Sequence, residues 1–227
     1  MWLVFTILTT LFWGVAELFY KLGAERKTKY THLRTAVFIG LVMGIHAIGV
    51  LIFKNTGFHP INLIYYFPVF FLYMLSMVLA AYGVRFIENS VSSVVEEFSS
   101  VITSALCFLI LGERIGGIAG LGMVLLTVGV VLLAAFETRD ENERPLDVTK
   151  KMLIIGFLMA LSYALLDGIG TFLDVFYLDI ETSPLKYVTE NTIEDVANIS
   201  YELSFLITAI ILYIFLKIRS EEHTSEL

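Results

Sequence analysis

The chain of 227 residues is 57% hydrophobic and only 16% charged, and its mean hydropathy is +0.81. A soluble domain averages about 45–50% apolar and about 25% charged residues, so the composition excludes an ordinary soluble domain and indicates a polytopic membrane protein. The net charge of −7 lies in short loops and indicates no nucleic-acid partner, and one cysteine with four scattered histidines indicates no disulfide, metal or cofactor.

Seven apolar runs are predicted to be transmembrane helices. Each is long enough to span, since about 20 helical residues cross about 30 Å of hydrocarbon, and the runs do not alternate as barrel strands do. The first run has no basic n-region and no small-residue cleavage site, so we interpret it as an uncleaved span. The predicted spans are residues 2–22, 35–53, 63–84, 89–111, 115–136, 152–174 and 199–218.

Two polar inserts divide the chain. Residues 137–151 form a charged linker between a first unit of five spans, residues 1–136, and a second unit of two spans, residues 152–218. A second, acidic insert, residues 178–200, separates the last two spans. The sequence therefore predicts an all-α membrane protein of about seven helices in two units.

The two units show weak internal symmetry. A shift of 150 residues aligns Trp13 with Tyr163 and Glu17 with Asp167. An aromatic residue then precedes an embedded acid in both units, as expected of a transporter built from repeats. The alternative is that two apolar helices align by chance.

Basic residues predict the orientation of the spans. Cytoplasmic loops carry an excess of Lys and Arg. If the N-terminus lies outside, all 15 Lys and Arg residues fall on the cytoplasmic side except Lys54, Arg114 and Lys186. The charge count therefore favours an N-terminus outside the cell.

Glu17 and Lys21 lie four residues apart near the end of the first span. An ionisable group within the hydrocarbon costs roughly 2.5–3.5 kcal/mol, and such groups usually mark a pathway. Lys21 can extend its stem to the interface, whereas Glu17 is too deep to do so. Glu17 either faces a cavity and binds a proton or cation, or it forms an anchoring i,i+4 pair with Lys21.

Polar residues follow one face of the fourth span. A helix places residues three and four apart on the same face, so this stripe is predicted to face protein or water. It either lines a pathway or holds helices together through hydroxyl hydrogen bonds. The stripe comprises Ser92, Glu96, Ser99, Ser100, Thr103 and Cys107, and Glu97 lies on the adjacent face.

Three further features are notable, and the first two have two interpretations each. His46, in the middle of its span, is either a helix–helix contact or a ligand. Asp167 lies beside Gly168 and Gly170, which either loosen the helix at a binding site or allow close packing around the acid. Small residues at four-residue spacing favour close packing of the fourth and fifth spans; these are Gly112, Gly116 and Gly120.

Residues 81–133 resemble the drug/metabolite transporter superfamily, specifically its EamA-type members. The most recognisable part is LGERI, residues 111–115, between two apolar runs, and Trp13-Gly14 resembles the WG of the family's first helix. The resemblance covers residues 1–136 well and later residues only as the start of a second repeat. One departure is Ser100, near the position where family members usually carry proline.

The resemblance implies ten spans in two inverted five-helix repeats, with substrate crossing between the halves. It also implies cytoplasmic termini, which is the alternative to the orientation from charge. Glu17 matches the embedded Glu of the small multidrug-resistance branch, where proton and substrate share it. Because only two spans of a second repeat are present, we expect a truncated chain in which residues 219–227 are a non-native tail.

We expect a secondary transporter of the plasma membrane that moves a small metabolite, amino acid or drug, with proton coupling. Expected partners are the lipid bilayer, the substrate and a second copy in a homodimer. The alternative is a non-transporting fragment or a structural membrane protein. An intramembrane enzyme is disfavoured, since Val101 replaces the Arg that a paired-Glu protease requires and no catalytic dyad is visible. The expected pathway residues are Glu17, Trp13, Glu96, Ser100, Thr103, His46, Asp167 and Tyr163.

Overall fold

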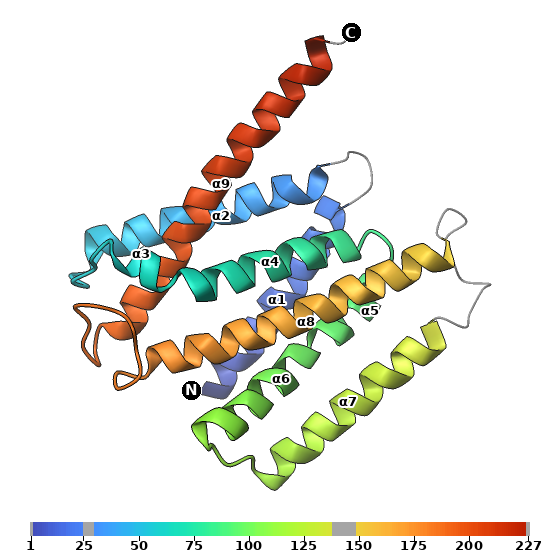
Figure 1. Ribbon diagram of the computed structural model, residues 1–227, viewed down its shortest axis with the longest axis horizontal. Helices are drawn as coiled ribbons and strands as arrows, with labels where there is room; N and C mark the ends of the chain where they lie inside the picture. Colours follow the sequence, from blue (N-terminus) through green and yellow to red (C-terminus); the bar gives the residue numbers. More distant parts are fainter. Residues whose placement is uncertain (1, 25–29, 138–148, 226–227) are drawn as a thin grey trace.

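The computed structural model describes residues 2–24, 30–137 and 149–225, and every regular element within these ranges is helical (Figure 1). This confirms the predicted all-helical class. The elements in chain order are α1 (Trp2–Ala24), α2 (Thr31–Phe53), α3 (Asn62–Tyr65), α4 (Phe67–Gly83), α5 (Asn89–Glu96), α6 (Phe98–Leu106), the π-helix η1 (Cys107–Leu111), α7 (Gly117–Glu137), α8 (Lys150–Leu178) and α9 (Ile193–Ser225).

Four helical segments are long and apolar enough to cross a membrane: Leu33–Phe53, Val91–Leu111, Lys150–Leu178 and Ile193–Arg219. Three shorter apolar segments are Leu3–Ala16, Phe67–Gly83 and Gly117–Leu133. Each of the seven overlaps one predicted span. Large apolar side chains cover the outside of the bundle, as a lipid-facing surface requires; on α2 they include Phe38, Ile45 and Ile52, which are 68%, 70% and 70% exposed.

Two predicted spans are interrupted rather than continuous. The third divides into α3 and α4 at Tyr66. Pro68, at the start of α4, has no backbone N–H and cannot continue the series of helical i→i−4 hydrogen bonds. The fourth divides at Glu97, whose carbonyl accepts from the Ser100 backbone N–H at 3.1 Å and from the Ser100 hydroxyl at 2.8 Å. Ser and Thr back-bonding of this kind bends helices, so the break occurs here without a proline.

Helices from the two sequence units pack against each other. Figure 1 shows α8 between α4 on one side and α5 and α6 on the other, while α2 lies against α9 and α7 lies at the edge. One buried cluster joins the start of α4 to α9, and another joins α5, α7 and α8. The first contains Tyr66, Val69, Phe70, Leu185, Ile193, Val196, Ala197 and Phe205; the second contains Ile87, Val91, Val95, Val130, Leu153 and Ala160.

Glycine allows the closest of these approaches. A Cβ atom at Gly40 of α2 would lie 2.4 Å from the Phe205 carbonyl oxygen of α9. A Cβ atom at Gly168 of α8 would lie 2.8 Å from the Ser99 carbonyl oxygen of α6. Helices that associate in lipid use small residues to bring their backbones close together. The contact at Gly168 brings α6 against α8 next to Asp167.

Candidate functional site

A cavity of about 390 Å³ lies where helices of both units converge. Its wall includes Trp13 of α1, Thr35 of α2, Tyr73 of α4, Asp167 of α8 and Tyr201 of α9. Apolar side chains cover much of the rest, with Met74 and Met77 among them. The volume lies within the range of about 300–1,000 Å³ that is usual for small-molecule sites.

Three carboxylates line this cavity: Glu96, Glu97 and Asp167. Glu96 is buried and accepts a hydrogen bond of 2.6 Å from the Ser92 hydroxyl, one turn earlier on α5. Glu97 lies in the break between α5 and α6 and is exposed. Ser93, Glu96 and Glu97 all line the cavity, and their i, i+3, i+4 spacing places them on one face of the helix.

Close packing of α6 against α8 positions Asp167. Its neighbours on the wall are the hydroxyl groups of Ser99 and Tyr163, which are its hydrogen-bond partners. The Thr103 hydroxyl lies 3.1 Å from the Ser99 carbonyl oxygen and 3.0 Å from that of Gly168, so it bridges the two helices. The α8 helix is continuous through Gly168, and the glycine serves close packing rather than a helix break.

Aromatic side chains form the side of the cavity nearest α4 and α9. The Tyr73 hydroxyl donates to Thr171 Oγ1 at 2.9 Å, which fixes the Tyr73 ring against α8. The rings of Tyr73 and Tyr201 meet edge to face with centroids 5.4 Å apart. Aromatic pairs prefer this geometry, so both rings are held in defined orientations at the cavity wall.

Four of the eight expected pathway residues line this one cavity: Trp13, Glu96, Tyr163 and Asp167. Trp13 and Tyr163, which the shift of 150 residues aligns, are therefore both at the same site. The Glu17 side chain lies outside what the structure describes, although its backbone belongs to α1.

Ser100 and Thr103 line a second cavity, of about 450 Å³, between α6 and α7. The fourth-span stripe is thus divided between two cavities: Glu96 and Ser99 line the first, whereas Ser100, Thr103 and Cys107 line the second. Glu113 and Arg114 also line this second cavity.

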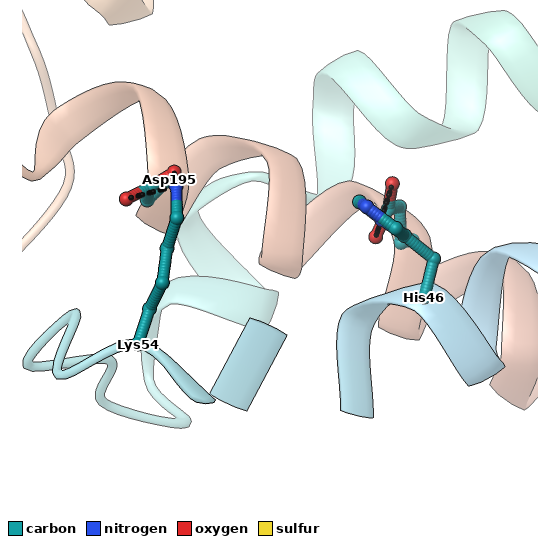
Figure 2. A network of polar contacts seen from close by, with 4 residues as sticks. His46, Lys54 and Asp195 are labelled. Atoms are coloured by element: carbon teal, nitrogen blue, oxygen red, sulfur yellow. Dashed lines mark hydrogen bonds and ion pairs between the residues drawn. The ribbon is translucent and has the colours of Figure 1, made fainter. Parts of the chain in front are cut away.

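His46 lies apart from both cavities, on the α2–α9 contact (Figure 2). Its Nδ1 atom is 2.8 Å from the Glu202 carboxylate, and the side chains of His46 and Glu202 are 67% and 16% exposed. A second pair, Lys54 with Asp195 at 3.0 Å, joins the same two helices. His46 therefore makes a helix–helix contact in this structure.

The glycines expected to pack the fourth and fifth spans are in open surroundings. Gly112 is not within a helix; it follows η1 with a φ of 71°. A Cβ at Gly116 would meet no heavy atom within 4 Å, and one at Gly120 would meet only Ile115 of its own segment, at 3.7 Å. Glycine is favoured at position 112 for a reason other than packing. The backbone adopts a left-handed conformation there at the end of η1, which glycine tolerates without steric cost.

Several wall residues were not expected from the sequence. Tyr73 lies in an aromatic run that resembles an interfacial belt, and Tyr201 is adjacent to the more conspicuous Glu202. Thr171 lies four residues after Asp167, which puts it on the same face of α8. That spacing is a signal in the sequence that Thr171 belongs to the site around Asp167.

The first 135 residues of the chain match the EamA-like transporter family. The chain belongs to this family. The match ends at the end of α7, so it includes Trp13, Glu96 and Glu97 but not the wall residues of α8 and α9. No curated protein and no solved structure gives a significant match to the chain. Family membership and the apolar helices make the protein a multi-pass membrane transporter of the drug/metabolite type.

Proposed function

We propose that the cavity between α4, α5, α6 and α8 is the substrate and proton site of a secondary transporter in the plasma membrane. The observation that carries this proposal is the convergence of Glu96, Glu97 and Asp167 on one cavity among apolar helices. Ionisable groups at membrane depth are expensive to bury and usually belong to ion or substrate pathways. A small metabolite, amino acid or drug has the size that the volume of about 390 Å³ accepts.

The surroundings of these acids support the proposal of proton coupling. Asp167 has hydroxyl neighbours that can stabilise either its protonated or its charged form, and Glu96 has the Ser92 hydroxyl. A carboxyl group that exchanges a proton for substrate within one cavity couples the two fluxes. Glu17, aligned with Asp167 by the repeat, belongs to the same proposal as a fourth embedded acid of the pathway.

The test is uptake by proteoliposomes that contain the purified chain and have an imposed pH gradient. A panel of amino acids, amines and nucleobases serves as substrate. We expect Asp167→Asn and Glu17→Gln to abolish uptake driven by the gradient, while Asp179→Asn, in the exposed loop after α8, retains it. Gradient-driven uptake that survives both substitutions would remove these acids from the coupling mechanism.

The orientation is testable because the structure places two loops together. The loop after α2 and the loop after α8 meet through the His59 and Tyr187 rings, whose centroids are 4.9 Å apart, so both lie on one side of the membrane. We propose that this side is outside. In a Cys107→Ala background, an impermeant thiol reagent added to intact cells should label Asn55→Cys and Glu190→Cys. Labelling of both only after the membrane is opened would instead place the N-terminus in the cytoplasm.

A further inference from the structure

The loop between η1 and α7, residues 112–116, contributes no residue to the cavity of about 390 Å³. It carries Glu113 and Arg114, the two charged residues of LGERI. The apolar segments Val91–Leu111 and Gly117–Leu133 flank it directly, so it lies at the membrane surface, at the depth of lipid headgroups. Both charged side chains are exposed, and neither has an ion pair or a side-chain hydrogen bond with another described residue. The loop therefore presents two opposite charges to the headgroup layer.

The second cavity, of about 450 Å³, extends from this loop into the apolar layer between α6 and α7. Glu113 and Arg114 line its outer end. Met123 and Leu126 line its inner end, and Leu126 lies nine residues, or about 14 Å of helical rise, beyond the start of α7. One end of the cavity is thus charged and lies at the membrane surface, while the other is apolar and lies within the bilayer. An amphiphilic ligand matches this division.

The hydroxyl groups on the inner wall are compatible with an apolar occupant. The Ser100 hydroxyl donates to the Glu97 carbonyl oxygen at 2.8 Å. The Thr103 hydroxyl has two carbonyl acceptors, Ser99 at 3.1 Å and Gly168 at 3.0 Å. Because the protein itself satisfies these donors, an acyl chain beside them leaves no donor without a partner.

The charges at the outer end match a zwitterionic headgroup. Phosphatidylethanolamine carries a phosphate beside a primary ammonium, so one headgroup can contact Arg114 and Glu113 together. Arginine binds phosphate through paired N–H donors, and a primary ammonium has N–H donors for a carboxylate. A choline headgroup has the same charges but no N–H donor, and a glycerol headgroup has no cation to offset Glu113.

We propose that the second cavity is a lipid site that selects phosphatidylethanolamine. The phosphate binds Arg114, the ammonium binds Glu113, and one acyl chain lies between α6 and α7. A lipid can enter from the bilayer, because α7 lies at the edge of the bundle (Figure 1) and Ile118 and Leu121 at its start are exposed. The inference is independent of the proposed function, since the two cavities share none of their described wall residues.

The test is native mass spectrometry of the full chain in detergent. Dioleoyl phosphatidylethanolamine, phosphatidylcholine and phosphatidylglycerol are added separately, and the first lipid adduct gives an apparent Kd for each. We expect phosphatidylethanolamine to bind about threefold to fivefold more tightly than the other two lipids. Arg114→Gln should weaken its binding by a similar factor, and Glu113→Gln should remove the preference over phosphatidylglycerol. Lys54→Gln and Glu190→Gln make the same charge changes outside the cavity and should preserve the preference.

A second pair of variants tests the acyl-chain part of the site. Gly122 lines the cavity, whereas Gly129, two turns further along the same face of α7, does not. A Cβ at either position would meet no heavy atom within 4 Å, so both positions can accept a side chain. Gly122→Leu fills the cavity and should weaken phosphatidylethanolamine by at least about tenfold, while Gly129→Leu should not. Thermal unfolding shows whether each variant is folded; if Gly122→Leu is not, the two variants of the exposed loop decide.

Three results would overturn the inference. Equal apparent Kd values for the three lipids would show that the lipid-facing surface does not discriminate between headgroups. Tighter binding of phosphatidylglycerol than of phosphatidylethanolamine would show that Glu113 does not take part. A preference that survives both Arg114→Gln and Glu113→Gln would place the bound lipid elsewhere on the protein. Each result leaves the transporter proposal intact, because uptake is tested through residues of the other cavity.

Discussion

The side-chain amide of Asn62 bonds both backbone groups of Lys186. Asn62 Nδ2 donates to the Lys186 carbonyl oxygen at 2.9 Å, and Asn62 Oδ1 accepts from the Lys186 N–H at 2.8 Å. Asn62 is fully buried at the start of α3, and Lys186 lies in the loop between α8 and α9. Lys186 Nζ also lies 5.3 Å from the centre of the Tyr65 ring, and the next residue, Tyr187, has a φ of 60°. This relationship ties the first unit of the chain to the second.

Replacement of Asn62 should therefore destabilise the protein. Asn62→Ala removes two hydrogen bonds and leaves two backbone groups of Lys186 without their side-chain partner, which lowers the free energy of unfolding by about 2–3 kcal/mol. Thermal unfolding in detergent measures this. Asn198→Ala, at an exposed position of α9, is the matched control and should change stability little. Equal melting temperatures for the two variants would show that the Asn62 contact contributes nothing.

The Tyr66 hydroxyl donates to the Asp174 carboxylate and joins the α3–α4 break to α8. Tyr66 is only 3% exposed, so Tyr66→Phe leaves Asp174 without this donor in a protected environment. Hydrogen bonds to charged groups contribute about 1.5–3 kcal/mol. A double-mutant cycle of Tyr66→Phe with Asp174→Asn should give a coupling energy of this order. Tyr65→Phe, at the neighbouring and more exposed tyrosine, is the control and should show no coupling to Asp174→Asn.

The two polar pairs between α2 and α9 in Figure 2 should differ in strength. Glu202 is 16% exposed and lies within an apolar segment, whereas Asp195 is 33% exposed near the start of α9. Exposed ion pairs contribute about 0–1 kcal/mol, but breaking a protected pair costs more. We expect His46→Ala to lower the free energy of unfolding by about 1–3 kcal/mol and Lys54→Ala by less than about 1 kcal/mol. Equal losses of stability for His46→Ala and Lys54→Ala would indicate that the depth of a polar pair in the bundle does not affect its contribution to stability.

Gly168 controls the distance between α6 and α8. A Cβ there would lie 2.8 Å from Ser99 O and 2.8 Å from Ile102 Cβ, so Gly168→Ala must separate the helices. We expect a loss of about 1–3 kcal/mol in stability and reduced uptake, because Asp167 moves away from Ser99. Gly129→Ala on α7 is the control, since its Cβ would meet nothing within 4 Å. That change should stabilise the protein by about 0.5–1 kcal/mol. Unfolding and uptake assays on both variants check the difference.

Local signals predicted some features of the site and missed others. Asp167 was predictable because an acid inside an apolar run is unusual by itself, and Trp13 because it belongs to the Trp13-Gly14 pair and aligns with Tyr163. Tyr73 and Tyr201 were not, because aromatic residues are common in membrane helices and only packing decides which of them face a cavity. The stripe pattern places Glu97 on the face adjacent to Glu96, whereas both acids line the cavity together with Ser93, which precedes them by three and four residues.

The sequence by itself determined the class of the protein and its family. Apolar length sets which segments enter lipid, because backbone hydrogen bonds there must be satisfied within helices. Tertiary structure decided which polar groups meet, since this depends on helix rotation and on contacts distant in sequence. Glu96 and His46 carried the same local signal of an ionisable residue in a span. Packing of α5 and α8 places Glu96 at the cavity with Asp167, while packing of α2 on α9 pairs His46 with Glu202 outside it.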